Sequence, residues 1–250
     1  MTDASGDREG PEHDLVPVPA VGRRFATRRR VRWGDVDRSS HLRLDALARY
    51  LQDLANDDTR DAGHDPLAPW VVRRTVVVVH RQPRLGEELD LVTFNGGTGS
   101  RWAERRTSVR GERGHVECAS LWVFVDPISG RPARLTQAFH DTFDEAAQGR
   151  TVGARLTHGP VPDLADRRRW EVRSTDIDPL GHVNNAATWE AIEDELARRG
   201  LVADRAELEY HDGIEPADDV ELISRIEGDT LALWLTVEGR VRATARLHVG

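Results

Sequence analysis

The sequence contains no lysine and only one cysteine, and these scarcities exclude several kinds of chemistry. All 35 basic residues are arginine, so neither a lysine Schiff base nor a lysine general base is available. A single cysteine, Cys118, forms no internal disulfide and no cysteine-based zinc site. It lies in an alternating apolar stretch, residues 116–125, whereas a nucleophilic thiol favours a polar, electropositive setting. We therefore expect Cys118 to be an inert core residue.

Long apolar runs and a basic charge balance are also missing. The valine run at residues 76–79 is far shorter than the roughly 20 apolar residues of a membrane-spanning helix. The N-terminus has no charged segment followed by an apolar one, as a signal peptide has, so a cytoplasmic location is expected. The net charge of −8 argues against nucleic-acid binding, which requires a basic face.

Arginines nevertheless cluster in four places, at residues 28–30 with 32, 73–74, 105–106 and 167–169. Such clusters are either solvated surface or a docking site for an acidic partner, and a phosphopantetheine carrier protein is such a partner.

The apolar pattern predicts helices and strands in a definite order. Residues 1–22 carry Asp, Glu, Gly and Pro without apolar periodicity and are predicted to be a disordered tail. Residues 30–37 resemble a short strand, and leucines at helical spacing then predict a helix over Leu44–Asp61. Four strands separated by Gly and Pro turns follow, at residues 71–81, 88–94, 101–110 and 116–125.

The same order begins again after a linker at residues 135–166, which contains a weakly helical piece near residues 139–147. A strand is predicted at residues 170–178 and a helix at Asn185–Arg199, closed by Gly200. Further strands are predicted at residues 206–210, 219–226, 231–238 and 240–249. These patterns divide the ordered chain into an N-terminal domain, residues 23–134, and a C-terminal domain, residues 167–250.

Residue matches between the halves indicate a tandem duplication. Asp35, Asp37 and His41 recur 141 residues later, at positions 176, 178 and 182. Further matches follow in the same order with smaller offsets. At an offset of 131, the matched residues are His80, Glu88, Leu89 and Leu91 with His211, Asp219, Val220 and Leu222. At an offset of 128, they are Val109 and Gly111 with Val237 and Gly239. We expect an α+β fold with two antiparallel sheets, each wrapped around one long central helix. The sheets should pair side by side, because each would otherwise expose an edge strand.

The densest local signal is the turn at residues 176–185, Asp-Ile-Asp-Pro-Leu-Gly-His-Val-Asn-Asn, which precedes the second long helix. Asn184 or Asn185 suits the helix N-cap. The unpaired N–H groups and the positive end of the helix dipole then form a site for a carbonyl oxygen that gains negative charge. Asp178 and His182 could supply a carboxylate base or nucleophile and an imidazole. Asp, Pro, Gly and Asn suit any strand-to-helix turn, but a turn does not require His182.

This turn resembles the corresponding motif of hot-dog-fold thioesterases. The layout from Phe25 onward resembles the acyl-ACP thioesterases, which carry two hot-dog domains in one chain. Segments of the first half add to the resemblance, at residues 44–55, 70–75, 83–87 and 119–126. The resemblance implies a tandem double hot-dog fold and the hydrolysis of a fatty acyl thioester, without a metal or a free cofactor.

Two positions depart from the pattern of that family. Leu180 stands where the family has Asn, and Gly213 stands where an acidic residue follows the Glu209-Tyr210 pair. Asp212 or Glu215 is close enough in sequence to substitute for the missing acid.

On this basis we expect the protein to release a fatty acid from acyl-ACP, as in fatty acid biosynthesis. Asp178 would activate water or attack directly, while His182 and Asn184 orient the water or the thioester. Asn185, Asp212 and Glu215 are expected to contact the substrate. The first half, which keeps Asp37 and His41, would mainly bind and support the acyl chain.

Three alternatives remain open at the level of sequence. Acyl-CoA could replace acyl-ACP at the same site. Hydration or dehydration of a β-hydroxyacyl thioester is disfavoured by the missing acid at Gly213. A non-catalytic acyl-carrier binder would fit the changes at Leu180 and Gly213. The expected partner is acyl carrier protein or acyl-CoA, and the chain would act as a monomer or a homodimer.

Overall fold

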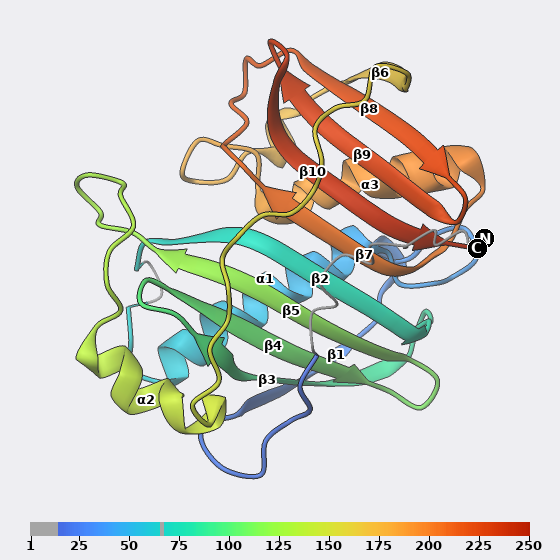
Figure 1. Ribbon diagram of the computed structural model, residues 1–250. Coiled ribbons are helices and arrows are strands. Elements are labelled where there is room, and N and C mark those ends of the chain that lie inside the picture. Colours follow the sequence, from blue (N-terminus) through green and yellow to red (C-terminus); the bar gives the residue numbers. More distant parts are fainter. Residues whose placement is uncertain (1–14, 66–67) are drawn as a thin grey trace, which may run out of the picture.

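The computed structural model describes residues 15–65 and 68–250, and its elements follow one order twice (Figure 1). The first half contains β1 (Phe25–Arg30), a 3-10 turn (Trp33–Asp35), α1 (Leu44–Asp61), β2 (Trp70–Arg81), β3 (Glu88–Thr98), β4 (Trp102–Arg110) and β5 (His115–Phe124). The second half contains β6 (Asp166–Trp170), a 3-10 turn (Ser174–Asp176), α3 (Asn185–Arg199), β7 (Ala203–Tyr210), β8 (Val220–Glu227), β9 (Thr230–Val237) and β10 (Arg240–Val249). A further helix, α2 (Gln137–Ala147), lies in the connecting segment.

The described strands form one ten-stranded antiparallel sheet in the order β1-β3-β4-β5-β2-β7-β10-β9-β8-β6. The two halves meet where β2 pairs with β7, from Arg74 opposite Glu209 to Val78 opposite Arg205. This pairing closes the edge that each half would otherwise expose. The predicted side-by-side arrangement and the α+β double hot-dog fold are therefore confirmed.

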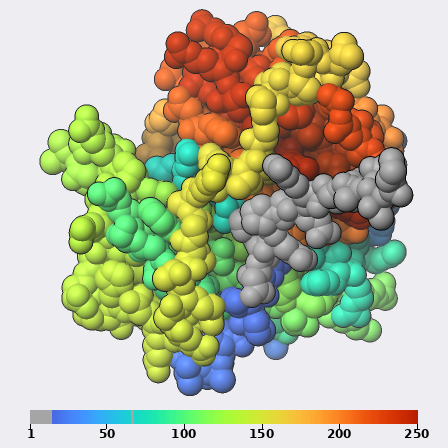
Figure 2. Space-filling view, in the orientation of Figure 1, coloured from blue at the N-terminus to red at the C-terminus, as the bar shows by residue number. Residues whose placement is uncertain are grey.

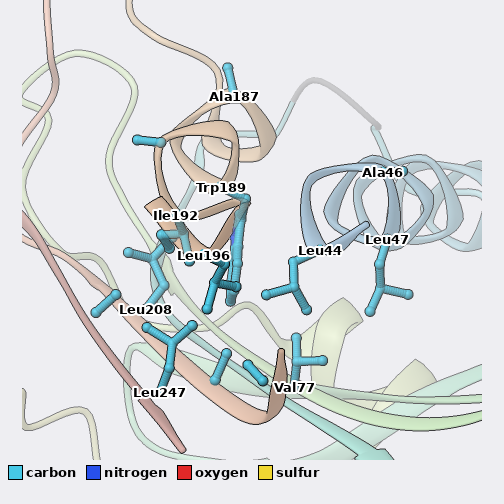
Figure 3. Packing of buried hydrophobic residues seen from close by; sticks show 14 of the residues in the cluster. Leu44, Ala46, Leu47, Val77, Ala187, Trp189, Ile192, Leu196, Leu208 and Leu247 are labelled. Atoms are coloured by element: carbon cyan, nitrogen blue, oxygen red, sulfur yellow. The ribbon is translucent and has the colours of Figure 1, made fainter. Parts of the chain in front are cut away.

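The two long helices lie next to each other on one face of this sheet (Figure 1). Leu44 and Leu47 of α1, together with Trp189 of α3, point toward the sheet in the packed core (Figure 3). The predicted helix bounds agree with the structure, and Gly200 closes α3 in the left-handed conformation that favours glycine. Both halves thus share one apolar layer between helices and sheet.

The first strand of each half lies earlier than predicted. β1 and β6 end at Arg30 and Trp170, where the predicted strands at residues 30–37 and 170–178 begin. Both are edge strands, held partly by cross-strand charge pairs such as Arg28 with Asp90 and Arg167 with Glu221, each 2.7 Å long. An apolar periodicity does not detect strands of this kind, so the prediction is wrong for both.

The predicted disordered tail, residues 1–22, falls partly outside the described residues. Within it, residues 15–22 form no helix or strand but make defined contacts. The Val16 carbonyl accepts a 3.0 Å hydrogen bond from the Arg106 guanidinium, and Gly22 lies against the backbone of Ala146. The prediction of disorder is therefore wrong for residues 15–22. They are held in place because the buried Arg106 needs a hydrogen-bond acceptor, which the Val16 carbonyl supplies.

The linker crosses the face of the sheet opposite the two long helices (Figures 1 and 2). Side chains of both halves hold its backbone. Trp102 Nε1 donates to the Val152 carbonyl at 2.7 Å, and Trp234 Nε1 donates to the Gly159 carbonyl at 3.0 Å. The division into domains at residues 23–134 and 167–250 remains a prediction.

The four arginine clusters contain residues that bind groups of the chain itself. Arg105 pairs with the buried Asp58, and the fully buried Arg106 pairs with Glu117. Arg74, also buried, lies 3.8 Å from a Glu207 oxygen. These contacts favour the interpretation of the clusters as parts of the fold.

Cys118 is buried, and burial raises the pKa of its thiol to about 12, which confirms an inert residue. In the part of the chain that the structure describes, no helix is long and apolar enough to cross a bilayer.

Candidate functional site

The turn before α3 is built around Asp178. The Asp178 N–H donates to the His182 carbonyl at 2.9 Å, and Asp178 Oδ1 accepts the Leu180 N–H at 2.8 Å. Gly181 provides the left-handed residue of the turn, with φ of 85°. One carboxylate oxygen therefore shapes the turn, and Oδ2 makes no hydrogen bond within the described chain. Leu180 points outward and is 81% exposed.

The N-terminus of α3 is capped by Asn184, one of the two asparagines that the sequence offered for this position. Asn184 Oδ1 accepts the Ala186 N–H at 2.8 Å, and the Asn184 N–H donates to the Asp176 carbonyl at 2.8 Å. This use of Oδ1 explains the residue structurally, and its part in orienting water remains a prediction. The preceding helical N–H group, that of Asn185, donates to no group of the described chain.

The loop after β7 runs beside this turn. The Val183 N–H donates to the Ile214 carbonyl at 2.8 Å. The His182 ring lies over Gly213 so closely that a Cβ at that glycine would be 3.0 Å from the ring. A larger residue at position 213 would therefore displace the imidazole. Gly213, where the resemblance leads one to expect an acid, instead makes room for His182.

The predicted substitutes for that acid point elsewhere. Asp212 is ion-paired with Arg242, and the exposed Glu215 donates its backbone N–H to Asp218 Oδ2 at 2.8 Å. Neither has a hydrogen bond or ion pair with His182 within the described residues. Their assignment to substrate contact remains a prediction.

A small pocket, part of it open to solvent, lies between the two halves at the start of α3. Its lining comes from α1, β2 and β5 of the first half and from α3 and β7 of the second. The lining residues are Ala48, Leu51, Gln52, Val72, Thr75, Ser120, Trp122, Asn185, Ala186, Trp189 and Tyr210. Asn185 thus lines a pocket at the helix N-terminus, and its contact with substrate remains a prediction.

Several polar groups in this pocket are buried. Thr75 Oγ1 lies 3.2 Å from Ser120 Oγ, and Tyr210 Oη accepts from Trp189 Nε1 at 3.0 Å and donates to the Asn185 carbonyl at 3.1 Å. Burial raises the pKa of the Tyr210 phenol, so it stays protonated near neutral pH. Sequence analysis missed Thr75, Ser120, Trp189 and Tyr210, because they come from four elements that only the fold brings together.

The first half has the same turn but a different helix start. Asp37 Oδ1 accepts the N–H groups of Ser39 and His41, each at 2.8 Å. At α1, however, the Leu44 N–H donates to the Glu193 carboxylate, which comes from α3 of the other half. Burial raises the pKa of Glu193 to about 7. A carbonyl oxygen cannot use this N–H while Glu193 occupies it.

Among the described residues, one cluster brings three possible metal ligands within 4.8 Å of one another, namely His158, Glu207 and Glu209. His158 belongs to the linker and the two glutamates belong to β7, so the cluster lies where the linker meets the sheet. Glu209 accepts the backbone N–H groups of Thr157 and His158, and His158 Nδ1 lies 2.9 Å from Thr244 Oγ1. The cluster therefore holds the linker to the sheet.

Comparison with protein families gives two matches that follow the duplication. Residues 22–143 match the acyl-ACP thioesterase N-terminal domain, and residues 162–243 match the acyl-ACP thioesterase C-terminal domain. Together these matches cover most of the chain.

Related proteins and structures span nearly the whole length. An uncharacterized protein of Mycobacterium tuberculosis, Rv2001, is 29% identical over 240 residues, which cover 94% of this chain and 95% of that protein. The 12:0-ACP thioesterase from Umbellularia californica has a TM-score of 0.77 at 20% identity, over 91% of this chain and 97% of that one. An acyl-ACP thioesterase from Bacteroides thetaiotaomicron has a TM-score of 0.78 at 16% identity, over 91% and 98%. At these identities the two structures establish the fold.

Proposed function

We propose that this chain, which belongs to the acyl-ACP thioesterase family and is a thioester hydrolase, releases a fatty acid from acyl-ACP at the N-terminus of α3. The observation that carries the proposal is the contrast between the two helix starts. At α1 the first N–H is occupied by Glu193, whereas at α3 the Asn185 N–H, which lies beside a pocket, has no partner among the residues that the structure describes. One chain would therefore hold one working site.

The thioester carbonyl would rest on the Asn185 N–H, where the helix dipole supplies about half a positive charge. Negative charge that develops on this oxygen during attack is stabilised there more strongly than in the ground state. The acyl chain would enter the pocket between the helices and the sheet, along Ala48, Leu51 and Val72.

Asp178 is the proposed base, because its Oδ2 makes no hydrogen bond in the turn. It takes a proton from water as the water oxygen bonds to the carbonyl carbon. The carbon–sulfur bond then breaks, and the proton passes to the departing thiolate. His182, positioned over Gly213, would orient the thioester, and the thiol product would be the phosphopantetheine arm of the carrier.

The family match supports acyl carrier protein as the carrier of the acyl group. The same reaction at this site would also hydrolyse acyl-CoA, because the thioester bond is the same. The proposed context is fatty acid biosynthesis in the cytoplasm.

The test is thiol release from acyl-ACP and acyl-CoA substrates of different chain lengths, followed with a thiol-reactive dye. Asp178→Asn should lower kcat by about 10²–10⁴-fold, the usual contribution of a positioned base. Asp37→Asn, the matched change in the first half, should leave kcat within about threefold, because Glu193 blocks that helix start; the melting temperatures of both variants serve as the folding control.

Loss of activity in Asp37→Asn alone would assign the reaction to the first half. If acyl-ACP binds but the wild type releases no thiol, the protein is a carrier binder and the proposal is wrong.

A further inference from the structure

The pocket at the start of α3 contains two buried polar atoms without a hydrogen-bond partner in the described chain. These are Gln52 Oε1, from α1, and Trp122 Nε1, from β5, and both residues belong to the first half. Buried polar atoms of native proteins are nearly always paired, because an unpaired one loses its hydrogen bonds to water without replacement. One atom is an acceptor and the other a donor, so the pocket is suited to a molecule that carries a hydroxyl group.

The duplication indicates what Gln52 is placed to do. Gln52 and Glu193 are separated by 141 residues, and so are Leu44 and Asn185, the first residues of the two helices. At the start of α1, the Glu193 side chain of the second half reaches the first helical N–H. At the start of α3, Gln52 of the first half lines the same pocket as Asn185.

The difference between the two contacts is chemical. The carboxylate of Glu193 binds the helix N–H directly, because a negative charge is favoured at a helix N-terminus. The carboxamide of Gln52 is neutral, and its Oε1 makes no such bond to the Asn185 N–H. The second helix start therefore keeps its N–H for a ligand, with an amide oxygen across the pocket from it.

We propose that Gln52 is a positioning residue for thioester hydrolysis, whose Oε1 accepts a hydrogen bond from the attacking water while the substrate carbonyl rests on the Asn185 N–H. The inference rests on the proposed function. In the reaction, the water oxygen bonds to the carbonyl carbon and the carbon–sulfur bond breaks. One water proton goes to the base and then to the thiolate, while the other is held by Gln52 Oε1, so the products are a free acid and a thiol.

This role requires residues of both halves at one reaction centre. The helix dipole comes from the second half, and the group that aims the water comes from the first. It also explains why position 52 carries a neutral amide, since a carboxylate there would compete with the substrate for the Asn185 N–H.

The test compares Gln52→Met with wild type by thiol release. Methionine keeps the length and burial of the side chain but removes the carboxamide. We expect kcat to fall about 10–100-fold, since misplacing a reactant by 1 Å can cost about 10²-fold. KM should stay within about threefold, because the substrate still binds through its carbonyl and acyl chain. Gln52→Ala should show the same loss of kcat.

Asn56→Leu is the matched control, since Asn56 Oδ1 is also buried and unpaired on α1 but does not line the pocket. Its kcat should stay within about twofold of wild type. Retention of half or more of the wild-type kcat by Gln52→Met overturns the role of Gln52 and leaves the proposed function standing. A loss that appears as raised KM with unchanged kcat also overturns it. Absence of thiol release by the wild type overturns the proposed function, and this role with it.

Discussion

At the scale of single residues, Glu193 is the clearest case of an acid whose surroundings change its chemistry. It is contributed by α3, and its carboxylate meets the Leu44 N–H at the start of α1. Burial raises its pKa to about 7 in spite of this hydrogen bond, and the neighbouring Asp45 acts in the same direction. The residue thus occupies one helix start, and ionising it there costs more free energy than ionising it in the unfolded chain.

A pH dependence of stability follows from that shift. In the unfolded chain Glu193 ionises near its ordinary pKa of about 4.5, so between pH 4.5 and 7 the folded state binds more protons. The contribution of this residue to the free energy of unfolding therefore decreases as the pH rises through that range. Glu193→Gln should remove this slope and stabilise the protein by about 1–3 kcal/mol above pH 7.

Urea unfolding of both proteins at pH 5 and pH 8 checks this prediction. The two free energies of unfolding should nearly coincide at pH 5 and separate at pH 8. A variant that is less stable than wild type at pH 8 would show that folding does not raise the pKa of Glu193.

At the scale of elements, the linker is held by side chains from both halves although it forms no strand on the sheet. Glu209 is fully buried and accepts the N–H groups of Thr157 at 2.6 Å and His158 at 3.1 Å. Glu209 is also on β7, which pairs with β2 of the first half. The linker therefore crosses the sheet near the junction of its two halves.

Glu209→Ala should destabilise the protein by about 1–3 kcal/mol, because it removes the acceptor of the Thr157 and His158 backbone N–H groups. Thermal unfolding followed by circular dichroism measures the change. Glu221→Ala on β8 is the control, since its pair with Arg167 is exposed on both sides and should contribute less than about 1 kcal/mol. Equal melting temperatures for Glu209→Ala and wild type would show that the linker adds nothing to stability.

At the scale of the whole molecule, charge decides how an acidic carrier approaches. The chain has a net charge of −8, and all four arginine clusters contain residues that bind groups of the chain itself. A strong basic docking face is therefore not expected, and long-range repulsion from an acidic carrier protein is screened beyond about 8–10 Å at physiological ionic strength.

We predict that acyl-ACP is used with a higher kcat/KM than acyl-CoA, and that the KM for acyl-ACP does not rise between 50 and 300 mM salt. Steady-state kinetics with both carriers at the two salt concentrations checks this. A KM for acyl-ACP that rises tenfold with salt would indicate a basic docking surface. Better use of acyl-CoA at both concentrations would refute the carrier assignment.

Much of the fold is readable from the sequence because it depends on local pattern and on repetition. The leucine spacing of α1 and the Asn and Gly residues that bound α3 determine the helices through propensity and capping. The 141-residue offset of Asp37 and Asp178 indicates two equivalent units, and two open sheets of this kind need a common partner edge. The edge strands β1 and β6 were predicted at the wrong residues, since charge pairs rather than an apolar pattern hold them.

The site was predictable only in its local part. Asp178, His182 and Asn184 share one turn, so their proximity follows from chain connectivity. The contacts of Gln52 with the pocket at Asn185, and of Glu193 with Leu44, join residues 133 and 149 positions apart. They exist because the halves pair through β2 and β7 and bring the helices side by side. The sequence by itself determined two similar units, each with an Asp and a His in the turn before its helix. The packing of one unit against the other decided which helix start is open, because each start faces a side chain from the opposite half.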